Sequence, residues 1–261
     1  MNYSLFFLVS LLGVRYYGIY GFASFNTYMF LFYQSRNNNA FQKVICSKNY
    51  VKGIEKCYEL VAYSMSAVNA VIISVFSSIY LLSYYALGAN DSSSSTGGLQ
   101  YGLEIVYKFS MGYYVADIIY VLSVAYSDKN KGRIAMISMQ DAFFILHHII
   151  VIYYQAFTID DRNELASTAR YYFSYCFLSE YAVLPLNYGW YLINTNQTKN
   201  KKFIITGIIT IIVYFLSRIV NFTTILYLLW LDELLSYGLI AVPLIAMNYY
   251  WFYKLLCKVI R

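Results

Sequence analysis

Five ionisable residues lie within long apolar stretches of this 261-residue sequence, and they are the first candidates for chemistry. A charged group at the centre of a membrane helix costs about 2.5–3.5 kcal/mol on an insertion scale, so each one needs a reason to be there. A histidine oriented by an aspartate can act as a general base on an amine or a hydroxyl, although the same pair is also an ordinary structural hydrogen bond. The five residues are Asp117, His147, His148, Glu180 and Arg218.

Polar residues on four of the apolar stretches share one depth. Each lies seven to nine residues from the basic end of its stretch, and the set is Asn69, Asp117, His147, His148 and Asn187. At a helical rise of 1.5 Å per residue, this depth is roughly 10–14 Å inside the membrane face. The sequence therefore predicts one polar layer in which Asp117 binds one imidazole and fixes its tautomer. Neighbouring helix residues point about 100° apart, so the two histidines cannot face one small target equally.

Glu180 and Arg218 share a second depth, near the membrane midplane. We expect them to form a buried ion pair, because a pair avoids the larger penalty of a lone buried charge. Zinc usually takes three or four convergent ligands, and the two histidines with Asp117 barely supply them. The sequence therefore predicts no metal and no cofactor.

The elements that position these residues are long and apolar. Hydrophobic residues make up 60% of the chain and charged residues only 12%, about half the charged fraction of a soluble domain. A bilayer core needs about 20 apolar residues per helix. We predict an all-α integral membrane fold of about seven transmembrane helices, at 5–33, 60–87, 103–126, 140–157, 171–194, 203–231 and 234–256.

The loops between these stretches alternate between basic and non-basic. The positive-inside rule then places the N-terminus in the lumen and the C-terminus in the cytoplasm. The net charge of +6 resides in these loops, so we exclude nucleic acid as a partner. The four cysteines show no metal spacing, and we expect no disulfide framework. The basic loops and tail carry Arg36, Lys43, Lys48, Lys52 and Lys56; Lys129, Lys131 and Arg133; Lys199, Lys201 and Lys202; and Lys254, Lys258 and Arg261.

At its polar residues the sequence resembles the TLC-domain family, which includes the TRAM proteins and the ceramide synthases. The resemblance runs from about Glu55 to Lys258. It implies a six-helix TLC-like domain at 51–258, preceded at 1–50 by an N-terminal helix and a basic cytoplasmic loop, in the endoplasmic reticulum or a related membrane. It rests on Ser110-Met-Gly-Tyr113 with Asp117, on the adjacent His147-His148, on Glu180 with Asn187 and Trp190, and on Phe215-Leu-Ser-Arg218.

The sequence departs from the family pattern at three places, and the first of them makes it look closer to the non-synthase branch. Ceramide synthases carry a His-Asp-x-x-Asp segment after the paired histidines, and that segment is absent here. Asn69 stands where many members have a histidine, and Pro185 lies one position later than the usual proline.

The leading hypothesis is a multi-pass protein that binds or regulates membrane lipids, either sphingolipid or phospholipid, for lipid homeostasis or trafficking. The alternative is an N-acyltransferase with acyl-CoA as substrate and a sphingoid amine as acceptor. In that reaction His147 or His148 is the base and Asp117 orients it. A seven-helix receptor, or a transporter with Glu180 and Arg218 as a relay, is the remaining option.

Overall fold

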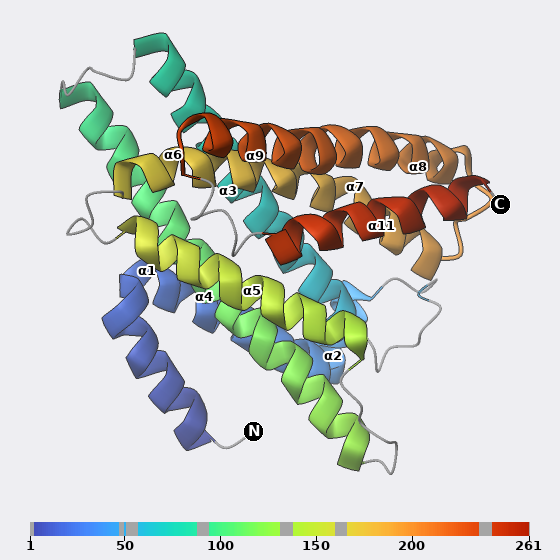
Figure 1. The fold of residues 1–261 in the computed structure, drawn as a ribbon. Helices are drawn as coiled ribbons and strands as arrows, with labels where there is room; N and C mark the ends of the chain where they lie inside the picture. Colours follow the sequence, from blue (N-terminus) through green and yellow to red (C-terminus); the bar gives the residue numbers. More distant parts are fainter. Residues whose placement is uncertain are drawn as a thin grey trace.

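All the secondary structure that the computed structural model describes is helical (Figure 1). The described residues are 3–46, 50, 57–87, 94–130, 138–159, 166–234 and 242–260. Within them, four helices are long and apolar enough to cross a membrane: Tyr58–Ala86, Gly98–Tyr126, Asp141–Ile159 and Lys201–Leu231. The chain therefore has the composition and helix lengths of a multi-pass membrane protein.

The first half of the chain forms long single helices. Most expected stretches are helical and extend beyond their predicted ends, as hydropathy marks the apolar core of a helix and not its polar turns. The helices are α1 (Tyr3–Asn37), α2 (Asn39–Ile45), α3 (Tyr58–Leu87), α4 (Ser94–Asn130) and α5 (Met139–Ile159).

The second half is helical too, but two of its long helices change their winding along the way. A 3₁₀ segment, η2, joins α6 to α7, and a π-helical segment, η3, joins α8 to α9. The expected last helix, 234–256, is described as helical only from Val242, and 235–241 lie outside the described residues. The elements are α6 (Ala166–Phe177), η2 (Leu178–Ala182), α7 (Val183–Asn194), α8 (Lys201–Tyr214), η3 (Phe215–Val220), α9 (Asn221–Leu231) and α11 (Val242–Ile260).

The helices gather into two groups that share α3. On one side α1 packs on α4, and α4 packs on α5; on the other side α6 to α9 lie together with α11 (Figure 1). Helix α3 contacts α1 and α4 in the first group, and α6, η2 and α7 in the second. Helix α3 therefore joins the two groups.

Helices α1 and α4 meet backbone to backbone. A Cβ atom added to Gly112 would lie 2.0 Å from the carbonyl oxygen of Gly21, so only glycine fits there. Small residues at membrane-helix crossings allow this close approach. Helix α1 is also kinked at Gly18, where a φ of 65° favours glycine. Position 112 therefore fixes where α1 rests on α4.

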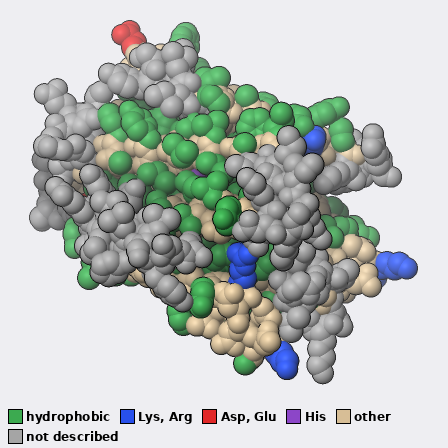
Figure 2. Space-filling model, turned by 90° about the horizontal axis from the view of Figure 1, so that it is seen from below, with side chains coloured by type: hydrophobic (Ala, Val, Ile, Leu, Met, Phe, Trp, Pro, Cys, Tyr) green, Lys and Arg blue, Asp and Glu red, His purple; other side chains and the backbone are tan. Residues whose placement is uncertain are grey.

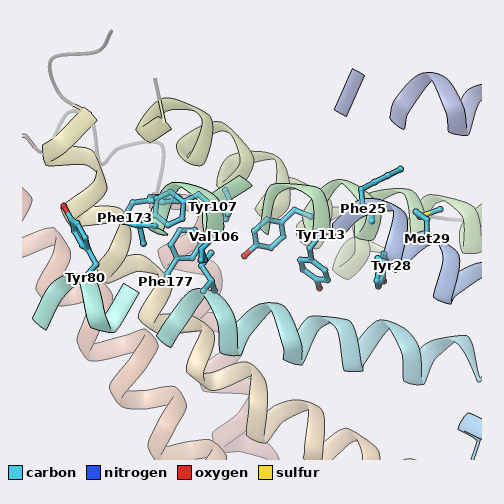
Figure 3. Close-up of a cluster of buried hydrophobic side chains, with 14 of the residues drawn as sticks. Phe25, Tyr28, Met29, Tyr80, Val106, Tyr107, Tyr113, Phe173 and Phe177 are labelled. Atoms are coloured by element: carbon cyan, nitrogen blue, oxygen red, sulfur yellow. The ribbon is translucent and has the colours of Figure 1, made fainter. Parts of the chain in front are cut away.

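Aromatic side chains fill the interior of the first group and extend to α6 of the second. Phe25 and Tyr28 of α1, Tyr107 and Tyr113 of α4 and Phe173 of α6 belong to one buried cluster (Figure 3). The described part of the surface is rich in apolar side chains as well, and Figure 2 shows hydrophobic side chains with few charges among the residues that it colours. A large exposed apolar surface on a helical protein is typical of lipid contact. Helix α8 contributes the exposed side chains Ile204, Ile205, Ile208, Ile209 and Ile212.

One cysteine pair corrects the sequence analysis. Cys46 and Cys57 form a disulfide, with their Cα atoms 5.8 Å apart. Helix α2 turns the chain back after α1, which brings Cys46 against the start of α3; the spacing of the cysteines in the sequence does not reveal this turn. Much of the charge pattern behind the predicted orientation, including Asp91, Lys131, Arg133 and Asp160, lies outside the described residues. The orientation stays a prediction.

Candidate functional site

The imidazole that meets Asp117 is that of His148. Its Nε2 lies 2.7 Å from Asp117 Oδ2, between α5 and α4. The other carboxylate oxygen, Oδ1, accepts a hydrogen bond of 2.8 Å from the hydroxyl of Tyr28 on α1. Three helices thus converge on one carboxylate, and each of its oxygens has a protein partner.

Beside this carboxylate lies a set of buried polar atoms without hydrogen-bond partners, which we call the unpaired polar group. It consists of Asn69 Oδ1, Ser110 Oγ, the Tyr114 hydroxyl, His147 Nδ1 and His148 Nδ1. A buried polar atom without a partner costs about 1–3 kcal/mol, so five in one place call for an explanation. Each can bind a polar ligand atom or a water molecule.

Tyr114 is the centre of the unpaired polar group. Its ring centroid lies 4.8 Å from that of His148 and 6.5 Å from that of His147. Its hydroxyl lies close enough to the side chains of Ser110 and Asn69 for a hydrogen-bonding interaction with each, although neither contact has the geometry of a regular hydrogen bond. The five atoms therefore belong to one region, bounded by α3, α4 and α5.

The structure brings together four of the five residues predicted to share a layer: Asn69, Asp117, His147 and His148. Asn187 is placed elsewhere. Its amide donates a hydrogen bond of 2.9 Å to the carbonyl of Tyr63 on α3, where it ties α7 to α3. Tyr63 lies six residues before Asn69, about 9 Å along the helix.

A second polar centre surrounds Arg218, and its bonds differ from the predicted ion pair. The guanidinium donates from Nε to the Ser179 carbonyl (3.2 Å) and from Nη1 to Asn248 Oδ1 (2.8 Å). Tyr214 also donates to Asn248 Oδ1, at 3.2 Å. Among the described residues no ion pair joins Glu180 to Arg218, although the two interact electrostatically. Arg218 lies on the π-helical segment η3, and such segments are frequent at functional positions.

Sequence reasoning missed Tyr28, Tyr114 and Asn248. Asn248 is a polar residue within an apolar stretch, and this isolation could have marked it as a candidate site residue. The tyrosines carried none, because the chain has 32 of them. Gln155 was also missed: it is buried two helical turns after His148, and both atoms of its amide are unpaired. Within the described part of the chain, no group of three or more His, Cys, Asp and Glu side chains is arranged to hold a metal ion.

A comparison with known protein families places the chain. The family model for the TLC domain matches residues 52–257, which include all of the described site except Tyr28. The chain belongs to the TLC-domain family. No curated protein and no solved structure matches it.

Proposed function

We propose that this TLC-domain protein binds a membrane lipid between α3, α4 and α5, and that it regulates lipid composition by doing so. The main support for this proposal is the unpaired polar group, whose five atoms lie together around Tyr114. Donors and acceptors of this kind suit the amide or hydroxyls of a sphingolipid, or the ester region of a phospholipid. The acyl chains would lie along the apolar helix faces.

We further propose that seven helical units span the membrane: α1, α3, α4, α5, α6 with α7, α8 with α9, and α11. The N-terminus is lumenal and the C-terminus cytoplasmic, in the endoplasmic reticulum or a related membrane. The alternation of basic and non-basic loops supports this orientation.

Glycosylation tests the orientation, since Asn-x-Ser/Thr sites are modified only on the lumenal side. The site at Asn90 lies in a predicted lumenal loop, outside the described residues, and the site at Asn196 in a predicted cytoplasmic turn. Translation into microsomes is expected to glycosylate Asn90, and Asn90→Gln to abolish the modification. Glycosylation of Asn196 would show that the chain has the opposite orientation in the membrane.

Mass spectrometry of copurifying lipids tests the binding. The protein is purified from membranes in mild detergent as wild type, His148→Gln, Asn69→Leu and Tyr153→Phe. Tyr153 is the matched control, because it lies on α5 with 55% of its surface exposed. We expect one lipid class to be enriched in wild type and Tyr153→Phe, and to fall about tenfold in the other two, as each loses a buried polar contact. Identical lipid amounts in all four samples would mean that the lipid binds only to the outer surface of the protein, and this result would refute the proposal.

A second candidate function is acyl transfer, favoured by the His148–Asp117 pair. With Nε2 held by the carboxylate, His148 keeps Nδ1 unpaired and buried, as a general base requires. A sphingoid amine would attack the acyl-CoA thioester carbonyl, forming the amide bond and breaking the C–S bond. His148 Nδ1 would take the amine proton and return it to the departing CoA thiolate.

The same purified samples separate the remaining alternatives. Incubation with acyl-CoA and sphingosine is expected to yield ceramide with wild type and none with His148→Gln if the protein is an acyltransferase. Lipid enrichment without turnover supports the regulator. Lipid-independent solute flux in liposomes would instead support a transporter.

A further inference from the structure

Helix α1 lies outside the matched TLC domain, yet it reaches the site. Tyr28 of α1 is fully buried, and its hydroxyl donates a hydrogen bond of 2.8 Å to Asp117 Oδ1. The other oxygen of that carboxylate is the one that meets His148. The carboxylate is therefore held from both sides, by α1 and by α5.

Packing locks the ring of Tyr28 in place. It makes edge contacts with Tyr113, at a centroid distance of 5.7 Å, and with Tyr120, at 6.4 Å. Tyr120 in turn packs against Phe32 of α1 at 5.0 Å. Figure 3 shows Tyr28 and Tyr113 beside each other within the buried cluster. A side chain fixed by its neighbours can hold a hydrogen-bond partner in a set position.

A second contact secures the register of α1 on α4. Gly21 and Tyr28 are two helical turns apart and so lie on the same face of α1, about 10 Å from one another. Gly21 touches Gly112 backbone to backbone, and Tyr28 bonds to Asp117, five residues further along α4. Two fixed points along one helix crossing leave α1 little freedom to slide.

We propose that α1 completes the lipid site, with Tyr28 as a positioning residue. By occupying Oδ1, Tyr28 aims Oδ2 of Asp117 at His148 Nε2, which leaves His148 Nδ1 free to meet the lipid. Tyr28 acts through Asp117 and does not touch the lipid itself. This inference rests on the proposed lipid-binding function and assigns a part of that site to a helix outside the TLC domain.

A double-mutant cycle with a fluorescent probe tests the inference. The full-length protein in nanodiscs is titrated with ceramide that carries a six-carbon NBD acyl chain. Tyr28→Phe is expected to weaken probe binding about tenfold, because it removes a hydrogen bond to a charged group. Tyr20→Phe is the matched control, since Tyr20 lies on the same helix with 42% of its surface exposed, and it should change nothing.

The inference predicts that Tyr28→Phe adds less than about twofold when Asp117 is already Asn, because both changes interrupt one chain of contacts. If the fold losses of probe binding in the two single variants multiply in the double variant, Tyr28 and Asp117 act independently. That result would overturn the inference, because Tyr28 would then only pack α1.

A second measurement separates failure of this inference from failure of the proposed function. The chain has two histidines, so the ¹⁵N imidazole signal of His148 can be isolated in a His147→Gln background. Tyr28→Phe is expected to shift that signal and Tyr20→Phe to leave it unchanged. If wild type binds no probe, the lipid proposal fails while this signal still reports on Tyr28. An unshifted signal in Tyr28→Phe would refute the positioning role.

Discussion

Asn69 and Asn248 are each 2% exposed, but their surroundings differ completely. Asn248 Oδ1 accepts from Arg218 and Tyr214, and its amide donates to the Leu244 carbonyl at 2.8 Å. Asn69 Oδ1 forms no hydrogen bond of regular geometry, and its interaction is with the side chain of Tyr114. One asparagine is saturated by the protein, and the other leaves bonding capacity unused in the interior.

We interpret the surroundings of Asn248 as a structural centre and those of Asn69 as the proposed binding site. Around Arg218 the charge, the amide and a backbone carbonyl satisfy one another, as a buried network must to be stable. Around Tyr114 the fold leaves polar atoms unpaired and thereby gives up stability. Sites that break a local rule at a cost in stability are expected to be functional ones. The three predictions below test this division.

The largest effect is expected from Asn248→Leu. This change leaves the buried Arg218 guanidinium without its 2.8 Å partner, and a hydrogen bond to a charged group contributes about 1.5–3 kcal/mol. The bond from Tyr214 to the same oxygen is lost as well. The thermal midpoint in detergent should fall steeply, while lipid bound per folded molecule should stay unchanged. An unaltered thermal midpoint would show that the contacts around Arg218 do not stabilise the fold.

Gly112→Ala should have an intermediate effect. The added methyl group would collide with the Gly21 carbonyl, and forcing extra atoms into a packed contact costs about 1–3 kcal/mol. Because α1 carries Tyr28, lipid binding should weaken along with stability. Gly207→Ala is the control: its added Cβ has nothing within 4 Å, so stability should hold or rise by up to about 1 kcal/mol. Equal behaviour of the two variants would contradict the close crossing of α1 and α4.

The smallest change in stability is expected from Asn69→Leu. Replacing an unpaired buried amide with an apolar group should leave the unfolding free energy unchanged or raise it by about 1 kcal/mol. Lipid binding should drop at the same time, which is the usual trade between stability and activity. The measurements are the thermal midpoint and the copurified lipid. A clear loss of stability would show that Asn69 belongs with Asn248 as a structural residue.

Hydropathy predicted the helices well, because length and apolar content are properties of each segment alone. Depth along the helices also brought Asp117 to the level of the histidines. Depth does not say which way a side chain points, however, and Asn187 lies on a face directed at Tyr63. The partners of Arg218 escaped prediction for a similar reason: the π-helical segment η3 changes the angular position of each residue on it.

The part proposed for α1 was beyond sequence reasoning altogether. A buried tyrosine on an apolar helix has the same appearance whether its hydroxyl meets a carboxylate or only packs among rings. In a chain with 32 tyrosines, Tyr28 could not be singled out. Its role emerges only from the crossing of two helices far apart in the sequence.

The redox state of Cys46 and Cys57 reports which side of the membrane the connection between α2 and α3 faces. Disulfides persist in oxidising compartments, whereas cytosolic thiols are kept reduced. The proposed orientation places the connection between α2 and α3 in the cytoplasm and so expects reduced thiols there, whereas an intact bridge favours the lumen. A maleimide that labels both sulfurs in freshly lysed cells places this connection in the cytosol, and labelling that needs prior reductant places it in the lumen. In a reducing compartment the ring that ties α2 to the start of α3 opens, and α1 is then held by its packing on α4 and α3.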